Sequence, residues 1–478
     1  MNRVVVVGGG FCGVTTAVNL ARLTESPLTV TVVNARHPLG RGVAYGTLRP
    51  EHVTNVVARN MSALADQPDH FVDWLRTRSD FAHVPLAELR EAFVPRRVFG
   101  DYLQSLLLWY ASAFADGRKV RIDRIQAEAV DVEPAGERVR VLLADGTTLD
   151  ADRVVLATGN PPPADLPGLA IDHPQYVRDP WGDWPSRLPD PAQPVALFGT
   201  GLTMVDAYLT LTALGWLGKV FAVSRSGLLP MSHFKGPDYP GFPDADPTTL
   251  RLNQVVTLLE THCRQLQSRG LNPAILVDKF RPHTQKVWQH FSVPEKRRFL
   301  TEYRSRWGAA RHRVPEFVAE RIDEGVASGR LEVFAGVIAS LTPTDAGLTV
   351  SVDTRTGRRD LAVGLAINCT GPAEGPDTSG QLLYRNLLVR GMVTPDEVDL
   401  GVRVTPEFEV VDRAGRRSAW LRVLGPPLRG TLYETTAVPE LRAQAFRVAE
   451  GIVAELKAAR ADVRAVDQTF ADVVEYTI

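Results

Sequence analysis

The chain has 478 residues, of which 44% are hydrophobic and 23% are charged, and its formal net charge is −1. This length exceeds what one hydrophobic core usually supports, so two or three domains are expected, and the near-neutral charge argues against bulk electrostatic binding of nucleic acid or anionic membrane. The three cysteines, Cys12, Cys263 and Cys369, are far apart and follow no CxxC or zinc-ligand pattern, which argues against a disulfide scaffold, a dithiol pair and a metal site.

The N-terminal sequence bears on targeting. The chain contains no run of 18 or more apolar residues, which argues against a membrane span. Its apolar start superficially resembles a secretory signal, but the three consecutive glycines at 8–10 would break the apolar helix and no small-residue cleavage site follows. We therefore expect a cytoplasmic protein that begins with a buried strand and a glycine turn.

The first predicted unit is a strand, a glycine turn, a helix and a second strand. Residues 4–7 (VVVV) are typical of a parallel strand buried on both faces, and the helix-like stretch after the turn runs to about residue 23. The turn has GxGxxG spacing, with Gly8, Gly10 and Gly13. Glycines there permit a tight turn, approach of a pyrophosphate and close packing of the helix on the strand, which predicts dinucleotide binding.

The second strand of this unit, 28–33, ends at Asn34, where Asp or Glu normally holds the adenosine ribose hydroxyls. The Asn34 amide oxygen can accept a hydrogen bond, although without the charge-assisted contact of a carboxylate. The alternative is that Asn34 only ends the strand.

The same pattern occurs a second time. Residues 195–198 (VALF) run into Gly199 and Gly201, a helix follows to about residue 214, and a strand over 219–223 ends at Ser224 and Arg225. Arg225 follows Gly199 by as many residues as Asn34 follows Gly8, which indicates a second dinucleotide-binding unit.

This second unit differs from the first at three positions. Met204 replaces the third glycine, so helix and strand are expected to lie farther apart, and the charge of Asp206 would repel a phosphate or cap a loop. Arg225 stands at the ribose position, where a guanidinium suits the 2′-phosphate of NADPH rather than NADH. The alternative is a solvated arginine after a strand.

Other segments complete the organisation. Residues 125–159 and 333–371 are two similar blocks of short strands, each closing in an apolar run that ends in Thr-Gly, and residues between about 246 and 330 are amphipathic helices. Late in the chain, Thr435 or Thr436 is expected to cap a helix through Phe446, with its N–H groups aimed at an electron-rich ligand atom.

With these residues placed, the chain resembles the FAD/NAD(P)-binding oxidoreductases related to bacterial lysine and ornithine N-monooxygenases, which are class B-like flavoprotein monooxygenases, and more narrowly their largely uncharacterised bacterial branch. The resemblance spans nearly the whole chain and is carried by these stretches: GGGFCG (8–13), GRGVAYGT (40–47), HVTNVVARNMSALADQPDHFVDWL (52–75), VPRRVFGDYL (94–103), VLATGNPPP (155–163), FGTGLTMVD (198–206), SRSGLLPMSH (224–233), RHRVPE (311–316) and the tail that starts at GPPLRG (425–430).

The resemblance implies an α/β fold with two Rossmann-like domains in a glutathione-reductase-like arrangement. The FAD domain would span 1–190, completed by 365–478, and the NADPH domain 191–364, with a helical insertion at about 246–330. FAD would be held at its ADP part by the first glycine turn and Asn34, with 41–45 beside the isoalloxazine and 429–438 at its far edge. The full set of expected cofactor-binding residues is Gly8, Gly10, Phe11, Cys12, Gly13, Asn34, Arg41, Gly42, Tyr45, Asn55, Met61, Ser62, Thr158, Gly159, Gly199, Gly201, Thr203, Arg225, Gly430, Thr431 and Thr436. Gly425-Pro426 replaces the Gly-Asp that binds the ribitol in many flavoproteins, so that contact is unassigned.

The resemblance also implies the chemistry. NADPH would reduce the flavin, and O₂ would then give a C4a-hydroperoxide that oxygenates a small molecule, such as an amine or amino-acid-like substrate. Two alternatives are an NADPH-dependent dehydrogenase or reductase that inserts no oxygen, and a non-catalytic flavin-binding or sensing protein, which Met204 and Asp206 motivate. A homo-oligomer is compatible with the sequence.

Candidate catalytic residues are Asn55, His233 and Arg311, and candidate substrate residues also include His283, Trp288, His312 and Arg313. The alternatives are that 311–313 is a solvated basic surface, that His233 is structural, that Trp288 is core and that Cys12 is a small packing residue.

Overall fold

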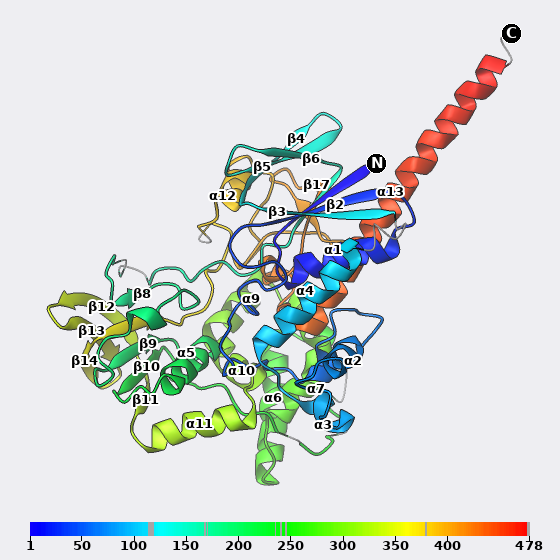
Figure 1. Ribbon diagram of the computed structural model, residues 1–478. Coiled ribbons are helices and arrows are strands. Elements are labelled where there is room, and N and C mark those ends of the chain that lie inside the picture. The colour runs from blue at the N-terminus through cyan, green and yellow to red at the C-terminus, as the bar shows by residue number, and fades with distance from the viewer. Residues whose placement is uncertain are drawn as a thin grey trace.

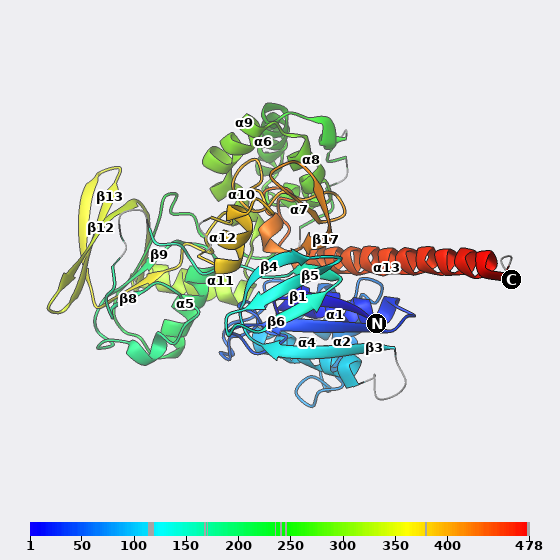
Figure 2. The ribbon, with the colours of Figure 1, turned by 90° about the horizontal axis from the view of Figure 1, so that it is seen from above.

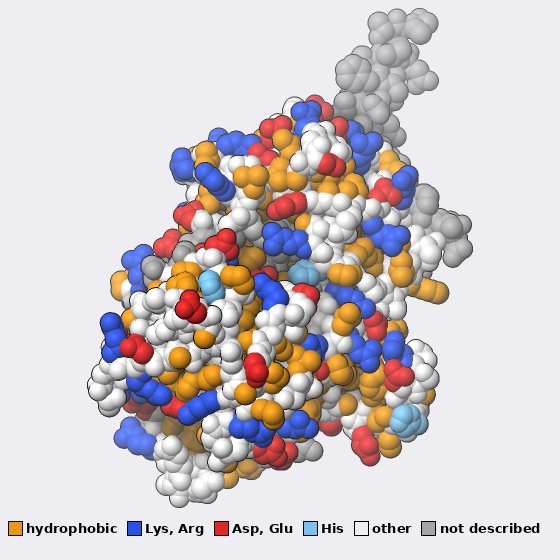
Figure 3. Space-filling view, turned by 60° about the vertical axis from the view of Figure 1, so that its left-hand side comes forward, with side chains coloured by type: hydrophobic (Ala, Val, Ile, Leu, Met, Phe, Trp, Pro, Cys, Tyr) orange, Lys and Arg blue, Asp and Glu red, His pale blue; other side chains and the backbone are white. Residues whose placement is uncertain are grey.

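The computed structural model describes residues 1–475 except 113–118, 167–168, 170, 235, 240, 244–245 and 378–379, with side chains described as far as residue 459. No helix within these described ranges combines the length and apolar character that crossing a membrane requires. On the face in Figure 3, basic and acidic side chains are interspersed without an extended patch of one sign, in keeping with the net charge of −1.

The first sheet has six strands in the order β16-β17-β7-β1-β2-β3. Its members are β1 (Asn2–Val7), β2 (Leu28–Asn34), β3 (Val120–Gln126), β7 (Arg153–Leu156), β16 (Glu409–Val411) and β17 (Arg417–Val423). The valines of β1 are buried because the strand pairs in parallel with β2 and β7 and helices cover the sheet. Beside the sheet, α1 (Phe11–Leu23) packs against α4 (Arg96–Ser112) and α13 (Val438–Glu475), which then extends beyond the rest of the described chain (Figure 1).

The second sheet has the order β11-β10-β9-β15-β8. Its members are β8 (Tyr176–Val177), β9 (Val195–Phe198), β10 (Val220–Ser224), β11 (Leu331–Ala335) and β15 (Leu365–Asn368), and α5 (Leu202–Ala213) and α11 (Glu316–Ala327) pack with them. Two of these strands correct the expected domain limits, since β8 lies within 1–190 and β15 within 365–478. The buried strand β9 pairs with β10 on one side and needs a hydrogen-bonded neighbour on the other, which β15 provides. β8 in turn pairs with β15.

Each of the two similar blocks contains a three-stranded antiparallel sheet, as the repeat predicts. The first is β4 (Ala129–Ala135), β5 (Arg138–Leu143) and β6 (Thr148–Ala151), with α12 (Leu382–Val389) packed on β4. The second is β12 (Val337–Thr344), β13 (Gly347–Thr354) and β14 (Gly357–Val363).

A separate helical part lies beside both sheets (Figure 2). It comprises α6 (Leu252–Ser268), α7 (Ile275–Phe280), α8 (Thr284–His290), α9 (Val293–Arg298) and α10 (Arg304–Arg311), with short helical turns at Arg281–His283 and Phe299–Tyr303. These helices share their own apolar core, whereas Val318 and Ile322 of α11 belong to the core of the second sheet. The predicted helical segment therefore divides at its last helix. The remaining short elements are α2 (His70–Arg76), α3 (Leu86–Glu91) and single turns at Ala58–Asn60, Pro185–Arg187, Pro247–Thr249 and Pro426–Leu428.

Candidate functional site

One large cleft, about 2070 Å³ in volume, lies among the first glycine turn, the start of α5 and the helical part. Drug-sized ligands occupy pockets of roughly 300 to 1,000 Å³, so this cleft has room for more than one such ligand. The segments that line it come from distant parts of the sequence: 7–12, 33–37, 41–45, 54–61, 157–165, 178–182, 202–203, 311–313 and 436–438.

The first glycine turn is fixed by close backbone contacts. A Cβ on Gly13 would lie 1.8 Å from the carbonyl oxygen of Gly8, and one on Gly8, whose φ is +113°, would lie 2.2 Å from the oxygen of Ala157. Gly10 is different, because its nearest neighbour would be Gly42 Cα at 3.5 Å, an ordinary contact, and both glycines border the cleft. The strand and helix therefore require Gly8 and Gly13, whereas Gly10 keeps a space open beside the helix.

The start of α1 has the donors that a phosphate needs. No side chain caps the helix at Gly10, so the N–H groups of its first turn have no side-chain cap as a partner. This turn directly follows the glycines that line the cleft. Such N–H groups and the positive end of the helix dipole together favour an anion. These features fit the pyrophosphate of a dinucleotide.

Asn34 borders the cleft and also holds the turn together. The Gly9 N–H donates to Asn34 Oδ1 (3.2 Å), and Asn34 Nδ2 donates to the carbonyl oxygen of His37. The side chain therefore does more than end the strand, and a contact with the ribose stays a prediction.

The second turn repeats only part of this geometry. Gly199 has a φ of +111°, and a Cβ there would lie 2.4 Å from the carbonyl oxygen of Cys369, as Gly8 approaches Ala157. Met204, where the third glycine would fall, is fully buried. Gly201 has open space around its Cα and no side chain caps α5 there, so the start of this helix also fits a phosphate.

The strand register corrects the expected equivalence of Asn34 and Arg225. Val7 pairs with Val33, 26 residues later, whereas Phe198 pairs with Val223, 25 residues later. Ser224 is therefore the counterpart of Asn34, because the second unit is one residue shorter between its paired strands. Its hydroxyl contacts that of Thr200 (2.9 Å), as the Asn34 amide contacts Gly9. Arg225 follows one residue later and is exposed.

Asp206 neither points freely at a phosphate nor caps a loop. It is buried and receives two hydrogen bonds from Arg96 at the start of α4, at 2.7 and 3.1 Å. Arg96 also donates to the carbonyl oxygen of Val53 (2.9 Å). The pair joins the first unit to the second at the edge of the cleft and neutralises the charge that the sequence analysis regarded as unfavourable.

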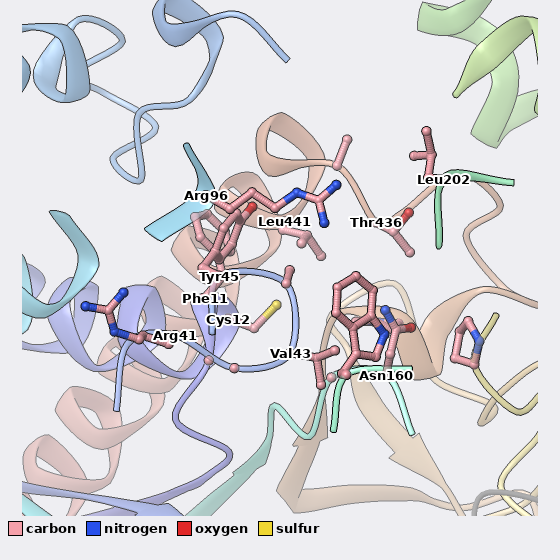
Figure 4. Close-up of a pocket in the computed structure, with 18 of the residues that line it drawn as sticks. Phe11, Cys12, Arg41, Val43, Tyr45, Arg96, Asn160, Leu202, Thr436 and Leu441 are labelled. Carbon is pink, nitrogen blue, oxygen red and sulfur yellow. The ribbon is translucent and has the colours of Figure 1, made fainter. Parts of the chain in front are cut away.

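Most of the expected cofactor-binding residues border the cleft. They are Gly8, Gly10, Phe11, Cys12, Asn34, Arg41, Gly42, Tyr45, Asn55, Met61, Thr158, Gly159, Thr203 and Thr436. Cys12, Tyr45 and Thr436 lie around it in Figure 4, whereas the Arg41 guanidinium is turned away from the centre. That guanidinium donates to Asp101 and to the carbonyl oxygen of Arg97, so it holds α4.

Seven other expected residues do not line the cleft: Gly13, Ser62, Gly199, Gly201, Arg225, Gly430 and Thr431. The Ser62 hydroxyl is buried and donates to the carbonyl oxygen of Gln67 (2.6 Å), which closes a local turn. The Gly430 carbonyl accepts from the Trp288 indole (2.7 Å), and the Thr431 N–H donates to Leu428 within a helical turn. These groups stabilise the walls rather than face the cleft.

The basic triplet 311–313 is not a solvated surface. Arg313 is buried and donates to Asp278 (2.8 Å) and to the carbonyl oxygen of Ala274 (2.7 Å), so its role is structural. Arg311 and His312 instead approach the carboxylate of Glu434, at 3.4 and 3.3 Å. All three residues border the cleft.

Glu434 is a residue of the cleft that was not among the predicted site residues. It has a φ of +63°, uncommon for a residue with a side chain, and its carboxylate accepts a hydrogen bond from the Trp307 indole (3.0 Å). Burial by itself would raise its pKa, but the hydrogen bond from His312 and the charges of His312 and Arg311 outweigh it, and the pKa is lowered. An ionised carboxylate thus lies beside a guanidinium and an imidazole at one end of the cleft. No local motif signals it, because its partners are more than 120 residues away.

Two of the candidate catalytic residues are in contact, because the side chain of His233 reaches the backbone of Asn55. His233 Nε2 donates to the carbonyl oxygen of Asn55 (2.9 Å), and its ring packs on Phe93. Burial lowers the pKa of His233, which favours a neutral imidazole. Trp288 is core, stacked on Tyr433, and His283 does not line the cleft.

The comparisons with known proteins agree with this geometry. Residues 5–161 match the model of a family described as FAD-NAD(P)-binding. An uncharacterised protein of Mycobacterium tuberculosis is 21% identical over 407 residues, which make up 77% of this chain and 74% of that protein.

Solved structures match over almost the whole chain. The ornithine N-hydroxylase of Kutzneria sp. 744, determined with reduced FAD, NADP⁺ and L-ornithine, has a TM-score of 0.66 at 18% identity, covering 95% of this chain and 99% of that one. The L-lysine 6-monooxygenase of Pseudomonas syringae has a TM-score of 0.60 at 19% identity, covering 94% and 99%. These likenesses confirm the expected fold, α/β with two Rossmann-like units, and the family match over residues 5–161 agrees with the expected FAD/NAD(P)-binding assignment of the first unit.

Proposed function

We propose that this chain is an FAD-dependent monooxygenase that NADPH reduces and that hydroxylates a nitrogen of a small amine. The observation that carries the proposal is that the first glycine turn and the first residues of α5, which follow the second glycine turn, line one cleft, and that each turn opens a helix without a side-chain cap. The first unit would hold FAD, and the second unit, beside the helical part, would hold NADPH.

The residues of the first unit would hold FAD. The N–H groups at the start of α1 would bind its phosphates, and Gly10 and Gly42, which border the cleft without side chains, would let the cofactor approach the protein backbone. Tyr45, Asn55, Met61 and Thr436 would border the ring. When bound, FAD supplies hydride acceptance from NADPH and, once reduced, the activation of O₂.

The polar end of the cleft would hold the substrate. Glu434 is ionised and would bind an ammonium group, whereas Arg311, beside it, would bind an acid group. A neutral His233 would accept or hold a proton at the border between the two units. The Arg96–Asp206 pair would keep the units at a fixed separation, as hydride transfer requires.

Anaerobic reduction followed by exposure to air tests the proposal. We expect the purified yellow protein to be bleached by NADPH, and with a small amine present its reoxidation should give hydroxylated amine with little hydrogen peroxide. Immediate stoichiometric peroxide with every amine offered would identify an oxidoreductase that inserts no oxygen. Failure of NADPH to bleach the flavin would leave the non-catalytic alternative, although the neutralised charge of Asp206 removes one reason for it.

A variant at Gly10 tests the cofactor site without reference to activity. A valine fits the backbone at Gly10, whose φ is −81°, but fills the space beside Gly42. Gly10→Val should therefore give a folded, colourless protein by circular dichroism and absorbance. A Gly10→Val protein that keeps a full complement of FAD would contradict the placement of the phosphates.

A further inference from the structure

An aromatic wall borders the cleft. It is formed by Phe93, His233 and Phe234, each of which is partly exposed rather than part of a core. The ring centroids of Phe93 and His233 are 5.0 Å apart, and the two planes are inclined by 38°. Burial lowers the pKa of His233, so its ring is neutral like those of its two neighbours. Walls of this kind bind the apolar part of a ligand, whereas a few polar groups fix its orientation.

The wall is assembled from two distant segments. Phe93 belongs to the first unit, where the Thr54 N–H donates to the Val94 carbonyl oxygen (2.8 Å) and the Val94 N–H donates to the Thr54 hydroxyl (3.2 Å). His233 follows β10 of the second unit, and its N–H donates to the carbonyl oxygen of Val314 (2.8 Å). The backbone therefore fixes both sides of the wall, which lies where the two units meet.

Arg313 fixes the end of the wall at Phe234. Its guanidinium lies over the Phe234 ring, 4.5 Å from the centroid, and donates to the carboxylate of Asp278 (2.8 Å). Because the Arg313 side chain is buried, it stays beside the ring as a fixed cation. An ammonium group at this end of the wall would meet that cation, whose carboxylate partner is already engaged, and like charges repel. The wall therefore suits an uncharged group.

The opposite preference applies at Glu434. Its carboxylate is held by Arg311 and His312, at 3.4 and 3.3 Å. These two residues directly precede Arg313 and Val314, which hold the wall, so one short segment carries both features. The same end of the cleft thus offers a carboxylate for an ammonium group and uncharged rings for the rest of the ligand.

We propose that the substrate is an amine that carries an aromatic ring, an arylalkylamine, with its ammonium group at Glu434 and its ring on the wall of Phe93, His233 and Phe234. The inference rests on the proposed function and narrows its substrate. Aromatic rings that pack on one another gain more than their buried area alone supplies, and this wall presents such rings to the cleft. A diamine, by contrast, would bring a second ammonium group to the fixed cation of Arg313.

Binding of phenethylamine and of putrescine, a diamine without a ring, to the oxidised, FAD-loaded chain tests the proposal by isothermal titration, without turnover. We expect the wild-type chain to bind phenethylamine about tenfold more tightly than putrescine. Phe93→Ala should weaken phenethylamine binding about tenfold and change putrescine binding less than about twofold. The matched control is Phe81→Ala, because Phe81 is a partly buried ring of the first unit that does not line the cleft, and both dissociation constants should stay unchanged.

Two outcomes would overturn the proposal. One is a wild-type chain that binds phenethylamine no more tightly than putrescine, or not at all, and the other is a Phe93→Ala chain that binds phenethylamine as the wild type does. The reoxidation assay with other amines decides the proposed function separately, because it requires only that some amine be hydroxylated. Should Phe93→Ala disturb folding, Phe93→Leu keeps an apolar side chain without a ring and should still weaken phenethylamine binding, whereas unchanged binding would defeat the role of the wall.

Discussion

The two glycine turns have the same backbone path but are held by different means. In the first, backbone atoms crowd the turn so closely that Gly8 and Gly13 admit no Cβ. In the second turn, only Gly199 is crowded in this way, and Met204 occupies the position of the third glycine. Side-chain contacts hold the remainder of this turn in place. Thr200 and Ser224 are linked by their hydroxyls, and Arg96 and His52 hold α5 from the first unit.

This difference assigns distinct roles to the two units. A turn fixed by backbone contacts keeps its shape whatever happens elsewhere, which suits a cofactor that stays bound. A turn held by side chains from another unit depends on how the two units meet, which suits a nucleotide that binds and leaves. Each expectation below tests one side of that comparison.

The largest effect is expected at the crowded turn. In Gly13→Ala the new methyl carbon would overlap the Gly8 carbonyl, and because a backbone atom cannot rotate away, we expect destabilisation above about 3 kcal/mol and loss of flavin. Urea unfolding and flavin absorbance measure both. Gly201→Ala, at the open position of the second turn, is the matched control and should stay within about 0.5 kcal/mol. Equal losses in the two variants would remove the distinction between the turns.

A smaller effect is expected at the Arg96–Asp206 ion pair, which holds α5. Asp206→Ala leaves the Arg96 guanidinium, with 14% of its side chain exposed, without its carboxylate, and we expect a loss of about 2 to 3 kcal/mol. The yellow colour should persist, whereas reduction by NADPH should slow because the separation of the units is no longer fixed. Stopped-flow absorbance measures the reduction.

The control for Asp206 is an ion pair on the surface. Asp66 pairs with Arg22, but half of its side chain is exposed, so Asp66→Ala should cost less than about 1 kcal/mol and leave reduction unchanged. If both variants had the same small effect, the Arg96–Asp206 pair would not join the units.

The features that the sequence predicts correctly are those that depend on residues close together in the chain. The buried valines of β1, the glycine turn before α1 and the two blocks of short strands each depend on residues close together in the chain, and the structure has them where the sequence predicts. Contacts between residues that are far apart in the sequence could not be predicted from it. Arg96 and Asp206 are 110 residues apart, and nothing in the sequence around either indicates the other.

The errors have a physical pattern as well. Equal spacing suggested that Arg225 matches Asn34, but one residue fewer between the paired strands of the second unit places Ser224 there. Counting residues cannot detect that difference, since the register depends on hydrogen bonds between strands. For the basic triplet, a solvated surface remained an open alternative because its partners Glu434 and Asp278 belong to other segments.

The Asn34 and Ser224 pair gives a finer comparison of the turns. Asn34→Ala leaves the Gly9 N–H and the His37 carbonyl without their partner, so we expect a loss of about 1 to 2 kcal/mol and weaker FAD retention. Ser224→Ala removes the contact with Thr200 and the hydrogen bond from the Gly227 N–H (3.0 Å), but Thr200 still donates to Leu228 (2.6 Å), so its cost should be about 1 kcal/mol. Flavin release on dialysis and urea unfolding separate the two. A larger loss in Ser224→Ala would reverse the comparison.

The smallest effect concerns pH and the other contact that holds α5. His52 Nε2 donates to the carbonyl oxygen of Asp206 (3.1 Å) and contacts the Thr210 hydroxyl (2.9 Å), and Nδ1 contacts Thr47 (2.8 Å). Burial lowers the pKa of the imidazole despite the nearby Asp206 carboxylate. Below about pH 6.5 the unfolded chain therefore binds a proton that the folded chain does not, and the free energy of unfolding falls as the pH falls. For one such group the slope is at most about 1.4 kcal/mol per pH unit.

His52→Gln keeps an amide that can donate to Thr210 but does not titrate. Urea midpoints between pH 7 and 5.5, above the range in which carboxylates are protonated, should decline less steeply in this variant than in the wild type. His37, His70 and His233 also have lowered pKa values and keep part of the slope in both proteins. An unchanged slope would mean that His52 is already protonated in the folded chain. The contact between α5 and the first unit would then be insensitive to pH in this range.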